Sequence, residues 1–276
     1  MGKYIDLHVH TSMSDGTSTP FEVVKQAADM NLAAIGITDH DTVNGVEASL
    51  EAGRILNVEV IPGVELSAEF EQELHILGYC IDVKSVQLKK TLKELREYRK
   101  MRNPKMIEKV NQLGMNITME EVKAYAQGTF IGRPHIAAIM IQKGYVQNIE
   151  EAFEKYLAIG GAAYVPKKKL SPYQAITLIK QAEGVPVLAH PVFLEQKDIA
   201  LEALVKQLIS YGLMGIEAYY TEHSLQMRER YIALARKYHL LVTGGSDFHG
   251  KNKPDIMLGR GYGDLYVPYD AIAQLK

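Results

Sequence analysis

Residues 4–16 read YIDLHVHTSMSDG, and this stretch decides how the chain is interpreted. Its first seven residues predict a strand. His8 and His10 are two positions apart, so on a strand both side chains point to the same face. Asp15 follows in the loop, and a helix is predicted over residues 20–30. The stretch therefore predicts a strand, a loop with metal-binding side chains, and a helix.

The same rhythm recurs along much of the chain. Short apolar runs predict strands, and segments with helical spacing of apolar residues lie between most of them. The further predicted strands are 33–38, 58–66, 74–81, 185–189, 215–220 and 240–244, and the further predicted helices are 44–56, 172–183, 199–211 and 225–238. About seven strands separated by helices favour an α/β barrel of parallel units. An open doubly wound sheet is the alternative.

Residues 97–165 break this rhythm. They are rich in helix formers, contain no buried-strand pattern, and are punctuated by Asn103-Pro104, Gly114 and Gly160-Gly161. We interpret them as a small helical insertion, a cap domain. The predicted domains are then a barrel of residues 1–96 and 166–276 and a cap of residues 97–165.

The composition is that of a globular protein, with 276 residues of which 47% are hydrophobic. No run approaches the roughly 18 apolar residues of a membrane span, and the N-terminus has no apolar signal region. A single cysteine, Cys80, fits a reducing compartment. We therefore expect a cytoplasmic protein without a membrane partner.

The net charge of −2 gives no footprint for long duplex nucleic acid. One local exception lies between Lys84 and Lys109, where ten Lys or Arg stand against three Glu. A solvated helix face is the simpler interpretation, and attraction of phosphate is the second.

Side chains that bind metals lie on the predicted strands or follow their ends. In parallel α/β barrels the carboxyl ends of the strands form the active face, so residues far apart in sequence can meet there. A lone histidine is more often a core residue, but the whole set is hard to explain by packing, since charged groups are rarely buried without partners. The candidate metal ligands are His8, His10, Asp15, His40, Glu65, His75, His190, Asp247 and His249.

Six segments carry a resemblance to a known family. They are DLHVHTSMSDG at 6–16, ITDHDTVNG at 37–45, PGVELS at 62–67, LHILGY at 74–79, LAHP at 188–191 and GGSDFHG at 244–250. Together they span nearly the whole chain and resemble the PHP family, the polymerase and histidinol phosphatase phosphoesterases. The resemblance implies a distorted (β/α)7 barrel that holds up to three metal ions.

The resemblance also implies three ligand groups. Carried over position by position, they are His8, His10, Glu65 and Asp247 for one metal, Glu65, His75 and His190 for a second, and Asp15, His40 and His249 for a third. Glu65 would bridge the first two metals. No position departs from the family's pattern.

Mixed imidazole and carboxylate ligands suit Mn²⁺, Fe²⁺ or Zn²⁺ better than Mg²⁺ or Ca²⁺, which prefer oxygen alone. We expect two or three divalent transition metal ions, with Mn²⁺ favoured. Neighbouring ions lower the pKa of bound water and clamp an in-line displacement. The expected nucleophile is therefore a metal-bridging hydroxide, and no catalytic residue separate from the ligands is required.

The cap, with IGRPHIA at 131–137, resembles the nucleotide phosphatase branch of the family. That branch acts on nucleoside monophosphates or 3′,5′-bisphosphates, and some members trim short RNA from the 5′ end. We expect a phosphoric monoester hydrolase whose partner is a nucleotide or short oligonucleotide. The candidate phosphate contacts are Arg133, His135, Lys167, Lys168, Arg102 and His223. For Arg133, a purely structural role at a helix start at Pro134 is an equal alternative.

Three other functions compete with this prediction. Hydrolysis of histidinol phosphate uses the same chemistry, but resemblance to that branch would not require a helical cap. An amidohydrolase-type deaminase also begins with H-x-H on a barrel strand, yet Asp15, Glu65 and the Asp247/His249 pair fit a trinuclear phosphoesterase better. A regulatory module without activity would show lost ligands, and the sequence shows none.

Overall fold

The computed structural model describes residues 4–126, 131–166, 168–194, 198–273 and 275. The chain divides into two compact units. Unit 1 comprises Met1–Thr91 and Lys169–Lys276, and unit 2 comprises Leu92–Lys168. Within the described residues, no helix is both long enough and apolar enough to cross a membrane.

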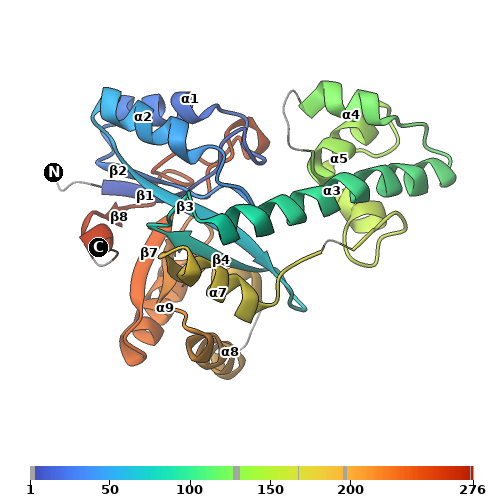
Figure 1. Ribbon diagram of the computed structural model, residues 1–276. Helices are drawn as coiled ribbons and strands as arrows, with labels where there is room; N and C mark the ends of the chain where they lie inside the picture. The colour runs from blue at the N-terminus through green and yellow to red at the C-terminus, as the bar shows by residue number, and fades with distance from the viewer. Residues whose placement is uncertain (1–3, 127–130, 167, 195–197, 274, 276) are drawn as a thin grey trace. The chain divides into compact units, whose positions relative to one another are not determined.

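Unit 1 is built around one sheet in which the strands are hydrogen-bonded in the order β7-β6-β5-β4-β3-β2-β1-β8 (Figure 1). The strands are β1 (Tyr4–Val9), β2 (Ala34–Ile37), β3 (Glu59–Ala68), β4 (Leu74–Tyr79), β5 (Val185–Leu188), β6 (Gly215–Tyr220), β7 (Leu241–Gly245) and β8 (Val267–Pro268). All of β4 and most of β1 are buried, as are all four residues of β2. Strands covered on both faces read as continuous apolar runs, which is why the sequence pattern located them.

The sheet curls until β7 approaches β1. The backbone N–H of Asp247 donates to the carbonyl of His8 at 2.9 Å, and that of His10 donates to Phe248 at 3.0 Å. The buried carboxylate of Asp6 strengthens this seam by accepting the backbone N–H groups of Ser246 at 2.8 Å and Gly259 at 2.7 Å. The predicted α/β barrel is thus confirmed as a nearly closed one, with the short β8 added as an eighth strand.

The direction of β4 differs from the parallel arrangement that the sequence predicts. β4 runs antiparallel to both β3 and β5. The connection from Ala68 to Leu74 is only five residues long and contains no helix. Because a parallel pair needs a crossover of a dozen or more residues, this short loop can only form a hairpin.

Helices cover the outside of the unit 1 sheet. They are α1 (Pro20–Asp29), α2 (Val46–Leu56), α7 (Pro172–Gln181), α8 (Asp198–Tyr211), α9 (Leu225–Lys237) and α10 (Asp270–Ala273), with 3₁₀ turns at Pro191–Leu194 and Gly250–Asn252. α1 packs beside α2, and α9 packs on β6. Side-chain caps define several starts, since Thr19 accepts the N–H of Glu22 and Ser171 that of Gln174.

Unit 2 is helical where it is described. Its elements are the later part of α3 (Val86–Gln112), then α4 (Met119–Ala126), α5 (Arg133–Gln142), α6 (Ile149–Ala152) and a π-helical turn at Phe153–Leu157. It has an apolar core of its own, which includes Met106, Val110, Ile136 and Met140. Pro104, which punctuates the sequence, lies inside α3 rather than at its end.

The β1–β7 seam generates a stability prediction. A β-carbon on Gly245 would overlap the backbone nitrogen and the Cβ of His8, whereas Gly114 has nothing within 4 Å and a φ of +87°. We expect Gly245→Ala to lower the free energy of unfolding by about 3 kcal/mol or more, because two strands must separate. Gly114→Ala should cost only about 1–2 kcal/mol of backbone strain.

The measurement is thermal and denaturant unfolding of the two variants beside the parent protein. A Gly245→Ala variant as stable as Gly114→Ala would show that β7 does not approach β1 this closely.

Candidate metal centre

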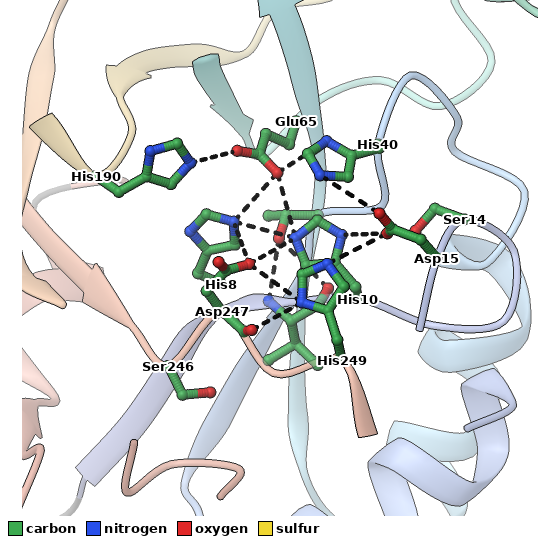
Figure 2. Close-up of polar contacts among 12 residues, drawn as sticks. His8, His10, Ser14, Asp15, His40, Glu65, His190, Ser246, Asp247 and His249 are labelled. Atoms are coloured by element: carbon green, nitrogen blue, oxygen red, sulfur yellow. Dashed lines mark hydrogen bonds and ion pairs between the residues drawn. The ribbon is translucent and has the colours of Figure 1, made fainter. Parts of the chain in front are cut away.

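The nine candidate ligands come from six strands or the loops after them and meet in one cluster in unit 1; Figure 2 labels all of them except His75. His8 lies on β1, Glu65 on β3 and His75 at the start of β4. Because β4 runs antiparallel, its first residues lie at the edge where the parallel strands end, and Ser67 pairs with His75. The reversed strand thereby carries His75 to the side of Glu65.

Glu65 stands at the middle of the cluster. Its Oε1 lies 2.8 Å from His75 Nδ1 and 2.9 Å from His190 Nε2. Its Oε2 lies 3.3 Å from His8 Nε2, 3.2 Å from His10 Nε2 and 3.1 Å from His40 Nδ1. The two oxygens of one carboxylate therefore face two different sets of imidazoles.

Asp247 and Asp15 complete the cluster. The Oδ1 of Asp247 is 3.5 Å from His8 Nε2 and 3.2 Å from His10 Nε2. Asp15 lies 3.3 Å from His249 Nε2 and 3.8 Å from His40 Nε2. The Nδ1–H of His249 donates to the backbone carbonyl of Asp247 at 2.8 Å, which leaves Nε2 free to face Asp15.

Donor atoms gather into three sets that could each hold an ion, all within 4.8 Å of one another in a set. They are His8, His10 and Glu65; His40, Glu65 and His75; and His10, Asp15, His40 and His249. The implied ligand groups differ from these sets in detail. His10 and His40 each belong to two of the three geometric sets. Asp247 and His190 belong to none of the three, although Asp247 Oδ1 lies 3.5 Å from His8 Nε2 and His190 Nε2 lies 2.9 Å from Glu65 Oε1.

Charge within the cluster suits a cation. Burial alone would raise the pKa of Glu65, Asp15 and Asp247, but the surrounding imidazoles, with Lys253 beside Asp247, hold each pKa well below its usual range. Burial lowers the pKa of His40 to about 3, which keeps that imidazole neutral. At His8 and His10, burial is outweighed by the neighbouring carboxylates, which raise the pKa of both rings, that of His10 to about 9, so a metal ion must displace their protons to bind them. The centre offers ionised carboxylates and, at His40, a neutral imidazole, the forms that metals bind.

Several buried nitrogen and oxygen atoms of the cluster have no hydrogen-bond partner within the described residues. They are His10 Nδ1, Asp15 Oδ1, His40 Nδ1, Glu65 Oε2 and His190 Nδ1. Buried polar atoms are nearly always paired, and a group left without a partner costs about 1–3 kcal/mol. Divalent ions bound among these atoms would offset that cost, so the residues present fit the metals that the sequence implies.

The backbone is strained where two of the candidate ligands leave their strands. His190 has a φ of +21° and Asp247 a φ of +59°, in a region that non-glycine residues rarely adopt. Such strain concentrates at functional sites, where the surrounding structure must enforce it.

Three residues at the cluster were missed by the sequence analysis. Glu217, on β6, lies 3.0 Å from His8 Nδ1 and is fully buried. Tyr220 donates its hydroxyl to Asp247 Oδ2 at 3.0 Å, and Lys253 donates to the same oxygen at 2.6 Å. A carboxylate inside the otherwise apolar run GIEAYY was the signal that could have identified Glu217.

A fourth missed residue, Asp39, shapes the loop before Asp15. It accepts the N–H and the hydroxyl of Thr11, both at 2.8 Å, and the hydroxyl of Ser14 at 2.5 Å. Asp39 directly precedes the candidate ligand His40, but the sequence does not indicate this role.

The candidate phosphate contacts in unit 2 make contacts within that unit. Arg133 donates to the carbonyl of Leu157 at 3.2 Å, and Arg102 donates to that of Val165 at 2.6 Å. His135 Nδ1 accepts the backbone N–H of Gly132 at 3.0 Å, at the start of α5. Lys168 Nζ lies 4.0 Å from the ring centroid of Tyr98.

Lys167 lies outside the described residues. His223, in unit 1, donates Nδ1–H to the carbonyl of Ala218 at 2.9 Å and is only 6% exposed. Burial lowers the pKa of His223 to about 4, so the ring is neutral at pH 7. Its Nε2 has no hydrogen-bond partner within the described part of the chain. The roles of these six residues toward phosphate stay predictions.

Known proteins resemble this chain over most of its length. It is 35% identical over 268 residues to the 5′-3′ exoribonuclease Rnm of Escherichia coli, covering 95% of this chain and 89% of the relative. It is 31% identical over 254 residues to a 3′,5′-nucleoside bisphosphate phosphatase of Chromobacterium violaceum, covering 89% and 87%. A solved structure from Bifidobacterium adolescentis, described as a candidate metal-dependent phosphoesterase, matches with a TM-score of 0.87 at 30% identity, covering 99% and 95%.

The PHP domain matches residues 6–185, which include six of the nine cluster residues. The geometry of the cluster and these similarities lead to one conclusion: the chain belongs to the PHP domain family.

Proposed function

We propose that this protein is a metal-dependent phosphoesterase that hydrolyses phosphate esters of nucleotides, including the 5′ ends of short RNA. The nine residues of the cluster hold two or three divalent ions, with Mn²⁺ as the preferred metal. The observation that carries the proposal is the set of buried, unsatisfied imidazole and carboxylate atoms around Glu65. The names of the exoribonuclease and bisphosphate phosphatase relatives support the nucleotide substrate.

The bound ions supply the hydrolytic chemistry, because they activate water and neutralise phosphate oxygens. The protein's own residues arrange the centre. Glu65 serves two groups of ligands through its two oxygens. Asp247 has Oδ2 engaged by Tyr220 and Lys253, so it presents Oδ1 to the cluster. Lys253 adds a positive charge beside the centre, which favours an anionic substrate.

Metal content gives the most direct test. Nine ligands exceed what one ion can use, so we expect more than one transition metal ion per chain in protein saturated with Mn²⁺ and then desalted. Chelation should abolish hydrolysis of nucleotides, and added Mn²⁺ should restore it. Elemental analysis that finds at most one ion per chain, with no gain of activity on adding Mn²⁺, contradicts the proposal.

Loss of one ligand gives a second test. Asp247→Ala should reduce turnover by roughly a hundredfold or more, since removal of a residue that only hydrogen-bonds to a metal ligand typically costs about 10–100-fold. Asp29→Ala is the matched control, because Asp29 is an exposed carboxylate in unit 1 that forms an ion pair with Lys25 on the same helix. Steady-state kinetics and thermal unfolding should be measured on both variants. Parental activity and metal content in Asp247→Ala would remove Asp247 from the site.

The predicted contact between Arg133, in unit 2, and the substrate phosphate gives a third test. If Arg133 contacts phosphate, Arg133→Ala should lower kcat/KM for nucleotides by about ten- to a hundredfold, the value of a charge-assisted bond of about 1.5–3 kcal/mol. Its effect on p-nitrophenyl phosphate should be much smaller. Lys143→Ala, which removes another cation at the end of the same helix, should change neither substrate. Equal losses on both substrates, together with a lower Tm, would assign Arg133 to a structural role, through contacts such as those with Leu157 and Phe153.

A further inference from the structure

Glu217 is the one fully buried carboxylate among the described residues that touches two candidate ligands from outside the cluster. We propose that Glu217 is a positioning residue that fixes the tautomer of His8 and the backbone of His190 with its two oxygens. This inference rests on the proposed metal centre and extends it to a residue that binds no ion itself.

The first contact sets which nitrogen of His8 is available. Glu217 Oε1 lies 3.0 Å from His8 Nδ1. An ionised carboxylate can only accept, so the proton of the neutral ring belongs on Nδ1. The lone pair is then on Nε2, the atom that lies 3.1 Å from His10 Nε2 and 3.3 Å from Glu65 Oε2. Glu217 therefore presents His8 to the cluster as an Nε2 ligand.

The second contact acts on the backbone. Glu217 Oε2 accepts the N–H of His190 at 2.8 Å. This residue has the strained φ of +21°, and its ring places Nε2 at 2.9 Å from Glu65 Oε1. The hydrogen bond holds the strand end in the conformation that directs the ring to Glu65. The side chain of Glu217 thus orients two histidines, His8 and His190, which face the two different oxygens of Glu65.

Both contacts require an acceptor, and this requirement distinguishes glutamate from glutamine. A glutamine of the same shape has one acceptor oxygen and one donor amide group. If the amide faces His8, the ring must carry its proton on Nε2 and its lone pair turns away from the cluster. If the amide faces His190, two N–H donors oppose each other. Glu217→Gln therefore disturbs one of the two ligands in either orientation.

The experiment uses Zn²⁺, a diamagnetic ion, as the probe. Zinc binding to the metal-free parent protein, Glu217→Gln and Glu202→Gln is measured by competition with a chelating dye. Glu202 lies on α8 and pairs with Lys237, so its variant makes the same chemical change away from the centre. We expect at least one zinc site in Glu217→Gln to weaken by about 10–100-fold. Glu202→Gln should bind zinc as the parent does.

A long-range ¹H–¹⁵N spectrum of the zinc-loaded proteins, with labelled histidine, reads the tautomer directly. In the parent we expect His8 to carry its proton on Nδ1 and to show a metal-shifted Nε2. Parental zinc affinity together with a parental His8 spectrum in Glu217→Gln overturns the inference.

If Glu217→Gln does not fold, the parent spectrum alone decides. A His8 ring protonated on Nε2, or bound through Nδ1, contradicts the inference. If the parent protein binds no zinc, the proposed metal centre itself is wrong. If the parent binds zinc and Glu217→Gln binds it equally well, only the inference about Glu217 is wrong.

Discussion

The carboxylate of Glu65 lies within 3.3 Å of a nitrogen on each of five histidines, His8, His10, His40, His75 and His190. A buried anion is costly unless positive charge surrounds it, and so is a buried set of imidazoles without partners. Neither group alone could occupy the end of the barrel. The rest of unit 1 brings these charged side chains together. It also supplies hydrogen-bond partners for ligand atoms such as His8 Nδ1 and Asp247 Oδ2.

That scaffold depends on two departures from a regular parallel barrel. The hairpin between β3 and β4 reverses one strand, so a histidine at the start of β4 reaches an edge otherwise formed by strand ends. The seam between β1 and β7 relies on Gly245, which lets the backbones approach, and on Asp6, which binds the loop that carries Asp247. Both departures make the sheet less regular, and each places a candidate ligand: the hairpin places His75, and the seam places Asp247.

The sequence predicted the barrel because buried strands are continuous apolar runs. It predicted that the candidate ligands meet because they lie on the strands or follow their ends, and the carboxyl ends of parallel strands share one face of the barrel. It did not predict the direction of β4, since an apolar run carries no direction; the short loop between β3 and β4 was the signal of a hairpin. The sequence did not identify Glu217 because its role depends on a contact with His8, which is 209 residues away in the chain. In unit 2, Arg133 and Arg102 show the same limit, because a basic side chain in a sequence does not reveal which carbonyl it binds.

The seam also has a consequence for folding order. Its hydrogen bond from Asp247 to His8 joins positions near opposite ends of the chain, and contacts of such long sequence separation form late because loop closure is entropically costly. A chain emerging from the ribosome can therefore assemble no complete centre until β7 and the loop after it, which carries Asp247 and His249, have been synthesised. Ions that bind only the closed barrel stabilise it by mass action. Metal binding would therefore stabilise the chain only after β1 and the loop after β7 have come together.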